Sequence, residues 1–201
     1  MKKIKLSDIM DIAEYEKIRP EFRKKIMAIK DKRRIHVGPV MTYLFENYDT
    51  MFYQVEEMMR AERIVNDDDI MQEINAYNEL IPEKNQLSAS LLIEIDDKQI
   101  RTEMLRKMID LPAHTFMVIN DKKIPAEFDP RQGSSEQLSS VQYIKFNLSE
   151  SDVDEFKNEN STIELLFDHP AYNYKHILSP EEKSVLYNDL TSQDSENLKS
   201  I

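Results

Sequence analysis

The chain has no cysteine and, in 201 residues, two glycines, Gly38 and Gly133. Without cysteine it cannot supply a thiol nucleophile, iron–sulfur ligands or a cysteine-type zinc site. Phosphate-binding loops, dinucleotide-binding turns and the serine nucleophile elbow all need closely spaced glycines. Two isolated glycines exclude these motifs, so we expect no nucleotide held in a glycine-rich loop and predict no cofactor and no resident metal.

Long apolar segments are also missing. No apolar run approaches the roughly 20 residues needed to cross a bilayer. Residues 1–8 are charged and no apolar region follows them, unlike a signal peptide. With a charged fraction of 32%, these features predict a soluble cytoplasmic protein that does not contact membranes.

The charge is unevenly distributed. Residues 1–36 carry 12 Lys/Arg against 6 Asp/Glu, whereas the rest of the chain carries 15 against 32, for a net charge of -11. The basic segment could bind nucleic acid or an acidic partner, or it could dock against the protein's own acidic body. No aromatic platform for bases alternates with the basic residues, so we favour internal docking and expect no nucleic-acid partner.

Hydrophobic periodicity predicts an α+β protein with helices at its N-terminal end. Residues 7–16 fit a helix capped by Ser7, and Pro20 suits the first turn of a second helix. A β-hairpin follows around the Gly38-Pro39 turn, and two more helices come next, the first over residues 51–65.

After Pro82, strands and helices alternate. The pattern strand–helix–strand occurs twice, which predicts a mixed sheet with two right-handed crossovers, a variant of the ferredoxin-like arrangement. The expected parts are residues 1–82, helical with a hairpin; 83–178, the sheet part; and 179–201, a C-terminal helix and disordered tail. The expected strands of the sheet part are 87–95, 115–119, 124–128, 141–148 and 163–167, with helices at 98–110 and near 149–156.

Glu62 interrupts an apolar pattern. At 100° per residue it falls inside the apolar stripe of the helix predicted over 51–65. A buried carboxylate needs a partner or a shifted pKa. Two interpretations stay open: a buried ion pair with Arg19, Arg23 or an arginine of the hairpin, or a site shared with Arg19, His36 and His169. The di-iron motif of helical bundles is absent, because no histidine follows a glutamate by three residues. The stripe consists of Met51, Phe52, Val55, Met58, Met59 and Val65.

Histidines supply the other candidates. His36 lies on the polar face of its predicted strand, where it either bonds a cross-strand neighbour or takes part in a site. Asp168 and His169 follow the last core strand, a position that often carries site residues, although an Asp-X-Pro turn also forms for structural reasons. Neighbouring side chains on a strand point to opposite faces, so we expect no simple Asp168–His169 dyad.

Several motifs resemble a known family. The matching residues are Tyr15…Arg19-Pro20-Glu21…Arg23, Gly38-Pro39, Phe45-Glu46-Asn47, Gln54…Glu57-Met58…Arg60…Glu62-Arg63, Tyr77-Asn78…Ile81-Pro82 and Asp168-His169-Pro170…Tyr172. The chain resembles a bacterial family of uncharacterised proteins, a domain of unknown function, over almost its whole length. The resemblance implies that both halves form one functional unit. It also implies a link to redox or oxidative-stress work, since members are encoded near rubrerythrin-like and iron–sulfur proteins. Glu56 and Met59 depart from the more Gln/Leu-rich helix of the family, which puts the surface around Glu57 in doubt.

Two hypotheses of different class follow. The first, which we favour, is a non-catalytic interaction or accessory protein with a redox-related protein partner. The second is a small-molecule- or metal-binding protein, enzyme or not, with a site between the helical part and the sheet. Both hypotheses are compatible with an oligomer. The candidate binding residues are Arg19, His36, Glu57, Glu62, Asp168, His169 and Tyr172.

Overall fold

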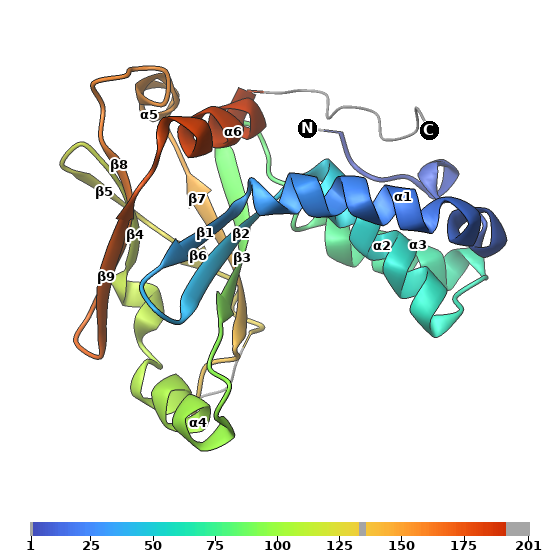
Figure 1. Ribbon diagram of the computed structural model, residues 1–201, viewed down its shortest axis with the longest axis horizontal. Helices are drawn as coiled ribbons and strands as arrows, with labels where there is room; N and C mark the ends of the chain where they lie inside the picture. The colour runs from blue at the N-terminus through green and yellow to red at the C-terminus, as the bar shows by residue number, and fades with distance from the viewer. Residues whose placement is uncertain (1, 133–135, 192–201) are drawn as a thin grey trace.

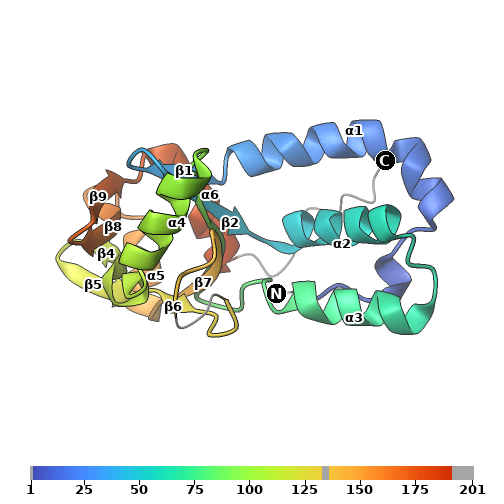
Figure 2. The same cartoon turned by 90° about the horizontal axis from the view of Figure 1, so that it is seen from below.

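The computed structural model describes residues 2–132 and 136–191 and divides them into a helical arm and a barrel-like body of two β-sheets. The arm projects from one side of the sheets (Figures 1 and 2), and each part has its own hydrophobic core. The α+β class with helices at the N-terminal end is therefore confirmed. The arm consists of the 3₁₀ helix η1 (Leu6–Asp8), α1 (Ile12–Asp31), α2 (Tyr48–Glu62) and α3 (Asp67–Asn78).

Each long helix of the arm begins at a side-chain cap. Asp11, Asn47 and Asn66 accept hydrogen bonds from backbone N–H groups in the first turns of α1, α2 and α3. These bonds satisfy donors that a helix leaves unpaired at its start. The apolar faces then meet in the arm's core, where the ring centroids of Phe22 and Phe52 lie 6.1 Å apart, edge to face.

α1 runs unbroken through Pro20, where the sequence predicts the start of a second helix. A proline inside a helix removes one hydrogen bond and crowds the preceding turn. Pro20 is exposed, so water can bond the carbonyl that it frees. Tyr15 before it and Phe22 and Ile26 after it are buried in the same core, which holds both halves on one axis.

α2 ends at Glu62, three residues before the predicted end. Arg63 adopts the left-handed conformation with φ 55°, and this change of backbone conformation stops the helix. Its N–H still bonds the carbonyl of Met59 and closes the last turn. Val65 therefore leaves the helix and is 75% exposed. Glu62 is exposed as well, so its predicted place in a buried stripe is wrong.

The strands form two antiparallel sheets. Among the described residues every strand pairing is antiparallel, which corrects the predicted mixed sheet with right-handed crossovers. The two strand–helix–strand segments pass from one sheet to the other, so neither closes a crossover within a sheet. In spatial order, the five-stranded sheet holds β1 (Arg34–Val37), β2 (Met41–Glu46), β3 (Gln86–Ile93), β7 (Val141–Asn147) and β6 (Glu127–Phe128); the four-stranded sheet holds β5 (Lys122–Pro125), β4 (Thr115–Ile119), β8 (Ile163–His169) and β9 (Tyr172–Ile177).

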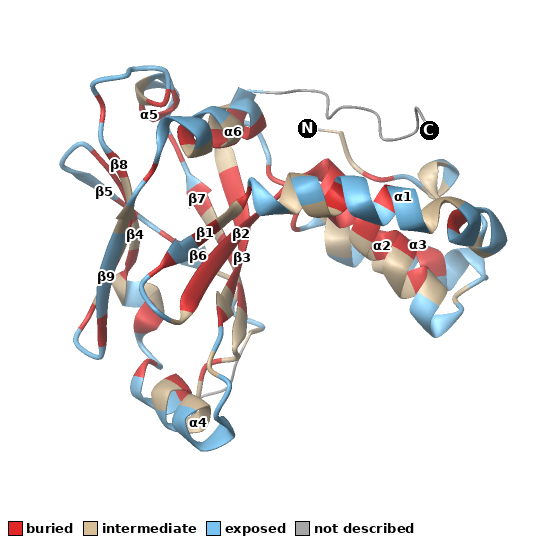
Figure 3. Ribbon diagram, viewed as in Figure 1, coloured by how far each residue is buried: buried red, intermediate tan, exposed pale blue. Residues whose placement is uncertain are grey.

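The sheets face one another and join along two sides. On one side β5 continues through Ala126 into β6, so one run of chain passes between the sheets. On the other side the Tyr172 hydroxyl of β9 donates a 2.6 Å hydrogen bond to the Val37 carbonyl of β1. Stacked rings fill the interior, with Tyr43 and Phe167 centroids 5.5 Å apart. Figure 3 shows the buried residues concentrated between the sheets and between the arm helices.

Helices cover both ends of the barrel-like body (Figure 1). Leu105 and Leu111 close one end and Leu186 and Leu190 the other, all within the same core. A buried ion pair between Arg33, just before β1, and Asp189 ties the last helix to the five-stranded sheet. These helices are α4 (Lys98–Lys107) and η2 (Leu111–His114) at one end, and α5 (Glu150–Glu155) and α6 (Pro180–Thr191) at the other.

The hairpin placed with the helices in the sequence-based division pairs with β3, so it belongs to the five-stranded sheet. The predicted C-terminal helix is α6, and residues 192–201 of the predicted tail lie outside the described residues. No helix within 2–132 and 136–191 is long and apolar enough to span a bilayer.

Candidate functional site

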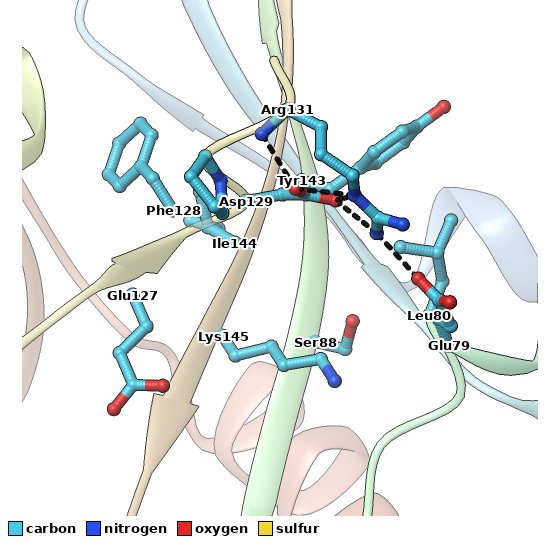
Figure 4. A pocket seen from close by; sticks show the side chains of 11 residues that line it. Glu79, Leu80, Ser88, Glu127, Phe128, Asp129, Arg131, Tyr143, Ile144 and Lys145 are labelled. Carbon is cyan, nitrogen blue, oxygen red and sulfur yellow. Dashed lines mark hydrogen bonds and ion pairs between the residues drawn. The ribbon is translucent and has the colours of Figure 1, made fainter.

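A pocket of about 350 Å³ lies where the arm meets the outer face of the five-stranded sheet (Figure 4). Glu79 and Leu80, just after α3, line its arm side, and β3, β6, β7 and the loop after β6 line the rest. A pocket of this size is at the lower end of the range for small-molecule sites. The two bodies of the protein thus share one concave surface.

A row of polar side chains forms the floor. Ser88 of β3 lies opposite Lys145 of β7, which lies opposite Glu127 of β6, and on the other side Ser88 lies opposite Glu46 of β2. Directly opposed residues share a face of the sheet. The row therefore reads carboxyl, hydroxyl, ammonium, carboxyl across four strands, with Glu46 beside the pocket and the other three lining it.

Glu46 is buried at the junction of β2 and α2. Its carboxylate accepts hydrogen bonds of 2.6 Å from the hydroxyl of Thr50, in the first turn of α2, and from the hydroxyl of Ser90 in β3. Burial raises the pKa of Glu46, although these hydrogen bonds and the nearby Lys30 and Arg33 oppose the rise. Glu46 thus joins the arm to the sheet directly beside the pocket floor.

Arg131 forms the rim. Its guanidinium bonds Asp129, with Nε 2.9 Å from Oδ1 and a terminal nitrogen 2.6 Å from Oδ2, and the same nitrogen bonds Glu79. The hydrogen bonds from Arg131 lower the pKa of Asp129. The ion pairs connect the loop after β6 to the end of α3, so they bridge the body and the arm above the pocket (Figure 4).

Lys145 and Glu127 carry opposite charges on directly opposed positions but form no ion pair with each other. Within residues 2–132 and 136–191, neither side chain has a hydrogen bond or salt bridge. Figure 4 shows the Lys145 side chain extending toward Ser88 and the Glu127 carboxylate pointing the other way. The pocket therefore contains one cation and one anion that form no ion pair in the described part of the chain, although the charge of Lys145 contributes to the lowered pKa of Asp129.

None of the seven residues predicted from the sequence lines this pocket. Arg19 does form an ion pair, but with Glu57 rather than Glu62: Nε lies 2.7 Å from Oε1 and a terminal nitrogen 2.9 Å from Oε2. The hydroxyl of Tyr15 donates a third bond, of 2.6 Å, to Glu57. Glu57 faces α1, whereas Glu62 lies at the exposed end of α2, which is why the expected pairing of Glu62 with Arg19 or Arg23 is wrong.

His36 bonds its cross-strand neighbour, as one of the two open interpretations expected. Its Nδ1 lies 2.8 Å from the Thr42 hydroxyl, and the two residues are register partners on β1 and β2. The Thr42 hydroxyl in turn donates to Glu94. These contacts make His36 part of a polar chain on the outer face of the sheet, away from the pocket.

Asp168 and His169 do not bond each other and form no dyad, as predicted, although both contact His114. Nε2 of His169 lies 2.9 Å from Asp110, and the backbone N–H of Ala171 donates to its Nδ1, so the ring proton faces Asp110. Asp168 bonds His114 at 3.0 Å, and the ring of His114 lies edge to face against that of His169, with centroids 5.1 Å apart. No group of three or more acidic or histidine side chains in the described residues is arranged to hold a metal ion. Tyr172, the last of the seven predicted binding residues, joins β9 to β1 through its hydroxyl.

Sequence reasoning missed the pocket residues, although one signal points to part of them. In β7 the apolar Ile144 and Phe146 alternate with Tyr143 and Lys145, which places a lysine on the outer face of a core strand. Which strands lie beside it depends on pairings between distant segments. No local pattern shows those pairings.

Fold and pocket define an α+β protein with a helical arm, an antiparallel barrel-like body and a small-molecule-sized pocket between them. The chain belongs to the family described as protein of unknown function DUF3501, which it matches over residues 3–190. This match confirms the resemblance to an uncharacterised family and covers both parts of the fold.

A solved structure shares this architecture. It is described as the crystal structure of a novel protein of unknown function from Burkholderia pseudomallei K96243. The chain resembles it with a TM-score of 0.87 and 25% sequence identity, over 94% of this chain and 100% of that one. No curated protein matches the chain.

Proposed function

We propose that this protein binds a small molecule in the pocket between the arm and the five-stranded sheet. The observation that carries the proposal is Lys145, an ammonium on the pocket floor with no hydrogen bond or ion pair within the described residues. A partly buried charge is stabilised by a counter-charge, and a ligand can supply one. Apolar groups from Leu80, Phe128 and Pro130 line the same space, as is usual for small-molecule sites.

A thermal-shift screen of a metabolite library tests the proposal. A ligand at 100 times its dissociation constant adds about 2.7 kcal/mol to the free energy of unfolding. For a chain of this size, that raises the Tm by several degrees, roughly 2–4 °C for each kcal/mol. We expect at least one compound to do so.

Two variants locate the binding. Lys145→Met should abolish the shift, whereas Lys25→Met, which removes an exposed lysine of α1, should keep it. Compounds that stabilise Lys145→Met as strongly as the wild type would contradict the proposal, and so would a library without a stabilising compound.

We propose as a second candidate that the arm docks a redox-related protein in the cytoplasm. The family resemblance supplies the partner class, the rubrerythrin-like or iron–sulfur proteins encoded nearby. The supporting observation is an apolar hollow of about 210 Å³ at the tip of the arm, lined by Leu6, Ile9, Ile64 and Val65 among others. Val65 is 75% exposed, and an exposed apolar group beside an apolar hollow is typical of interaction sites.

Co-expression with the neighbouring redox protein and size-exclusion chromatography test this candidate. We expect co-elution that Val65→Ser weakens. Ile100→Ser is the matched control, because Ile100 is 56% exposed on α4, away from the arm. Separate elution of the two proteins, or equal effects of both substitutions, would contradict the candidate.

A further inference from the structure

We propose that the ligand of the pocket is a zwitterion, with its anionic group on Lys145 and its cationic group on Glu127. This inference rests on the proposed function and names the chemical class of ligand that the pocket takes. It follows from an ion pair that the fold sets up but does not form.

Lys145 and Glu127 are direct register partners on neighbouring antiparallel strands. Opposite charges at such positions lie close enough to attract each other when their side chains turn together. Here they turn apart: the ammonium lies on the side of Ser88, and the carboxylate lies on the far side of β7 (Figure 4). Both side chains still line the same pocket. A ligand that bridges the two side chains would supply a counter-charge to each of them.

The other charges of the pocket disfavour a ligand with one charge. Arg131 is already bonded to Asp129 and Glu79, so Lys145 is the lining cation without an ion pair or hydrogen bond in the described residues. A simple anion on Lys145 would lie near three carboxylates, those of Glu79, Glu127 and Asp129, and like charges repel. A simple cation on Glu127 would face Lys145. A molecule that carries both charges offsets each of these repulsions with an attraction at its other end.

Neutral groups of the pocket fit the rest of such a molecule. The hydroxyl of Ser88 lies beside Lys145 on the floor and can donate a hydrogen bond to the anionic group. Leu80, Phe128 and Pro130 offer an apolar wall for a hydrocarbon segment. An amino acid, with its charges on one carbon or at the two ends of a chain, has this combination of groups.

Isothermal titration calorimetry with probes of matched skeleton tests the inference on the full chain. The first set is 6-aminohexanoate, hexanoate and hexylamine, and the second is phenylalanine, 3-phenylpropanoate and 2-phenylethylamine. The sets differ in the distance between the two charges. In at least one set we expect the zwitterion to bind at least about tenfold more tightly than either singly charged analogue, since each charge-assisted hydrogen bond contributes about that factor.

Substitutions separate the two contacts. Glu127→Gln should reduce the advantage of the zwitterion over the carboxylate to less than about threefold, with carboxylate binding unchanged or stronger. Lys145→Met should abolish binding of both. Lys25→Met, on the exposed face of α1, should leave all affinities at the wild-type values.

The outcomes distinguish this inference from the proposed function. A carboxylate that binds as tightly as its zwitterion in both sets, or a zwitterion advantage that survives Glu127→Gln, would overturn the inference. Loss of that same binding in Lys145→Met would still support a small-molecule site. If none of the six probes binds while a library compound depends on Lys145, the zwitterion is wrong and the proposed function stands.

Discussion

Two buried tyrosines of the barrel-like body differ at the hydroxyl. Tyr43 is fully buried, and its hydroxyl has no hydrogen-bond partner in the described part of the chain. Tyr172 is also buried, but its hydroxyl donates to the Val37 carbonyl at 2.6 Å and accepts from the Val40 N–H at 3.3 Å. A buried polar group without a partner lowers stability by about 1–3 kcal/mol, whereas a formed bond contributes about 1 kcal/mol.

Phenylalanine at each position should therefore have opposite effects. We expect Tyr43→Phe to raise the free energy of unfolding by about 1 kcal/mol and Tyr172→Phe to lower it by about 1–2 kcal/mol. Urea denaturation followed by circular dichroism measures both. A loss in Tyr43→Phe equal to that in Tyr172→Phe would show that the Tyr43 hydroxyl has a partner after all.

The two glutamates of α2 singled out by the sequence also differ. Burial alone would raise the pKa of Glu57, but hydrogen bonds from Arg19 and Tyr15 outweigh it and lower the pKa below the ordinary value of 4.5. A carboxylate with a lowered pKa stabilises the fold fully above its ordinary pKa, and the stabilisation is lost as the pH falls through the lowered value. The pH window of this effect thus lies below about 4.5.

We expect Glu57→Gln to lower the free energy of unfolding at pH 7 by about 1–3 kcal/mol, because it weakens charge-assisted hydrogen bonds. The difference from wild type should shrink as the pH falls below 4.5. Glu62→Gln, on the same helix but exposed, should change stability by less than about 0.5 kcal/mol. Denaturation curves at pH 7 and at acid pH measure these differences, and equal effects of the two substitutions would contradict the pairing.

At the scale of elements, local sequence patterns predict whether a helix or a strand forms. They predict less well where that element ends and which of its faces is buried. The alternation in β7 is visible in the sequence and the strand forms where expected, whereas α2 begins and ends three residues before the predicted bounds of 51–65. The end of α2 depends on a left-handed Arg63, a conformation that arginine does not signal. Because the helix ends there, Glu62 lies at the exposed helix end instead of in the predicted stripe. The predicted ion pair of Glu62 is lost for the same reason.

Gly38 is where the turn between β1 and β2 meets β9. Its φ is +71°, and a Cβ at this position would lie 2.6 Å from the Tyr172 hydroxyl and 2.6 Å from the Tyr174 ring. We expect Gly38→Ala to lower the free energy of unfolding by about 2 kcal/mol or more, from the left-handed backbone and from the crowding together.

Pro39→Ala is the control in the same turn, because Pro39 is exposed and its loss acts mainly through the unfolded chain, by less than about 1 kcal/mol. Hydrogen exchange should also show faster opening of β9 in Gly38→Ala. Equal losses in the two variants would mean that the turn does not hold the two sheets together.

For the whole molecule, the sequence predicts an α+β class and a split between helical and sheet parts, but not how the strands associate. β3 and β7 pair across a separation of about 50 residues, and β5 continues into β6 to connect the two sheets. Such pairings depend on which distant strands meet, and a period-two pattern does not encode this. The pocket could not be predicted from the sequence for the same reason, because Ser88, Glu127 and Lys145 meet only through those pairings.

The two hydrophobic cores predict a difference in local stability. The arm core is the smaller of the two, and the helices around it are held by backbone hydrogen bonds between residues close in sequence. The larger core lies between two sheets whose strands pair across long separations in sequence. Segments with fewer buried contacts open at lower free energy. The arm is tied to the body through Glu46, which bonds both α2 and β3, so unfolding of the body also removes a contact that holds the arm.

A matched pair of substitutions tests this order. Ile26 in the arm and Ile144 in the body are both buried, and Ile→Val at either position removes one methylene, at a cost of about 0.5–1.5 kcal/mol. In native-state hydrogen exchange, Ile26→Val should lower the opening free energy of amides in α1, α2 and α3, and that of amides in β3 and β8 by a similar amount, because body amides exchange through states in which the arm is open as well. Ile144→Val should lower the opening free energy of the β3 and β8 amides, while the arm amides, which exchange through a state in which the body is still folded, stay within about 0.3 kcal/mol of wild type. Equal lowering of both groups by Ile144→Val would instead show that arm and body open as one unit, and the pocket between them would then open only when the whole protein unfolds.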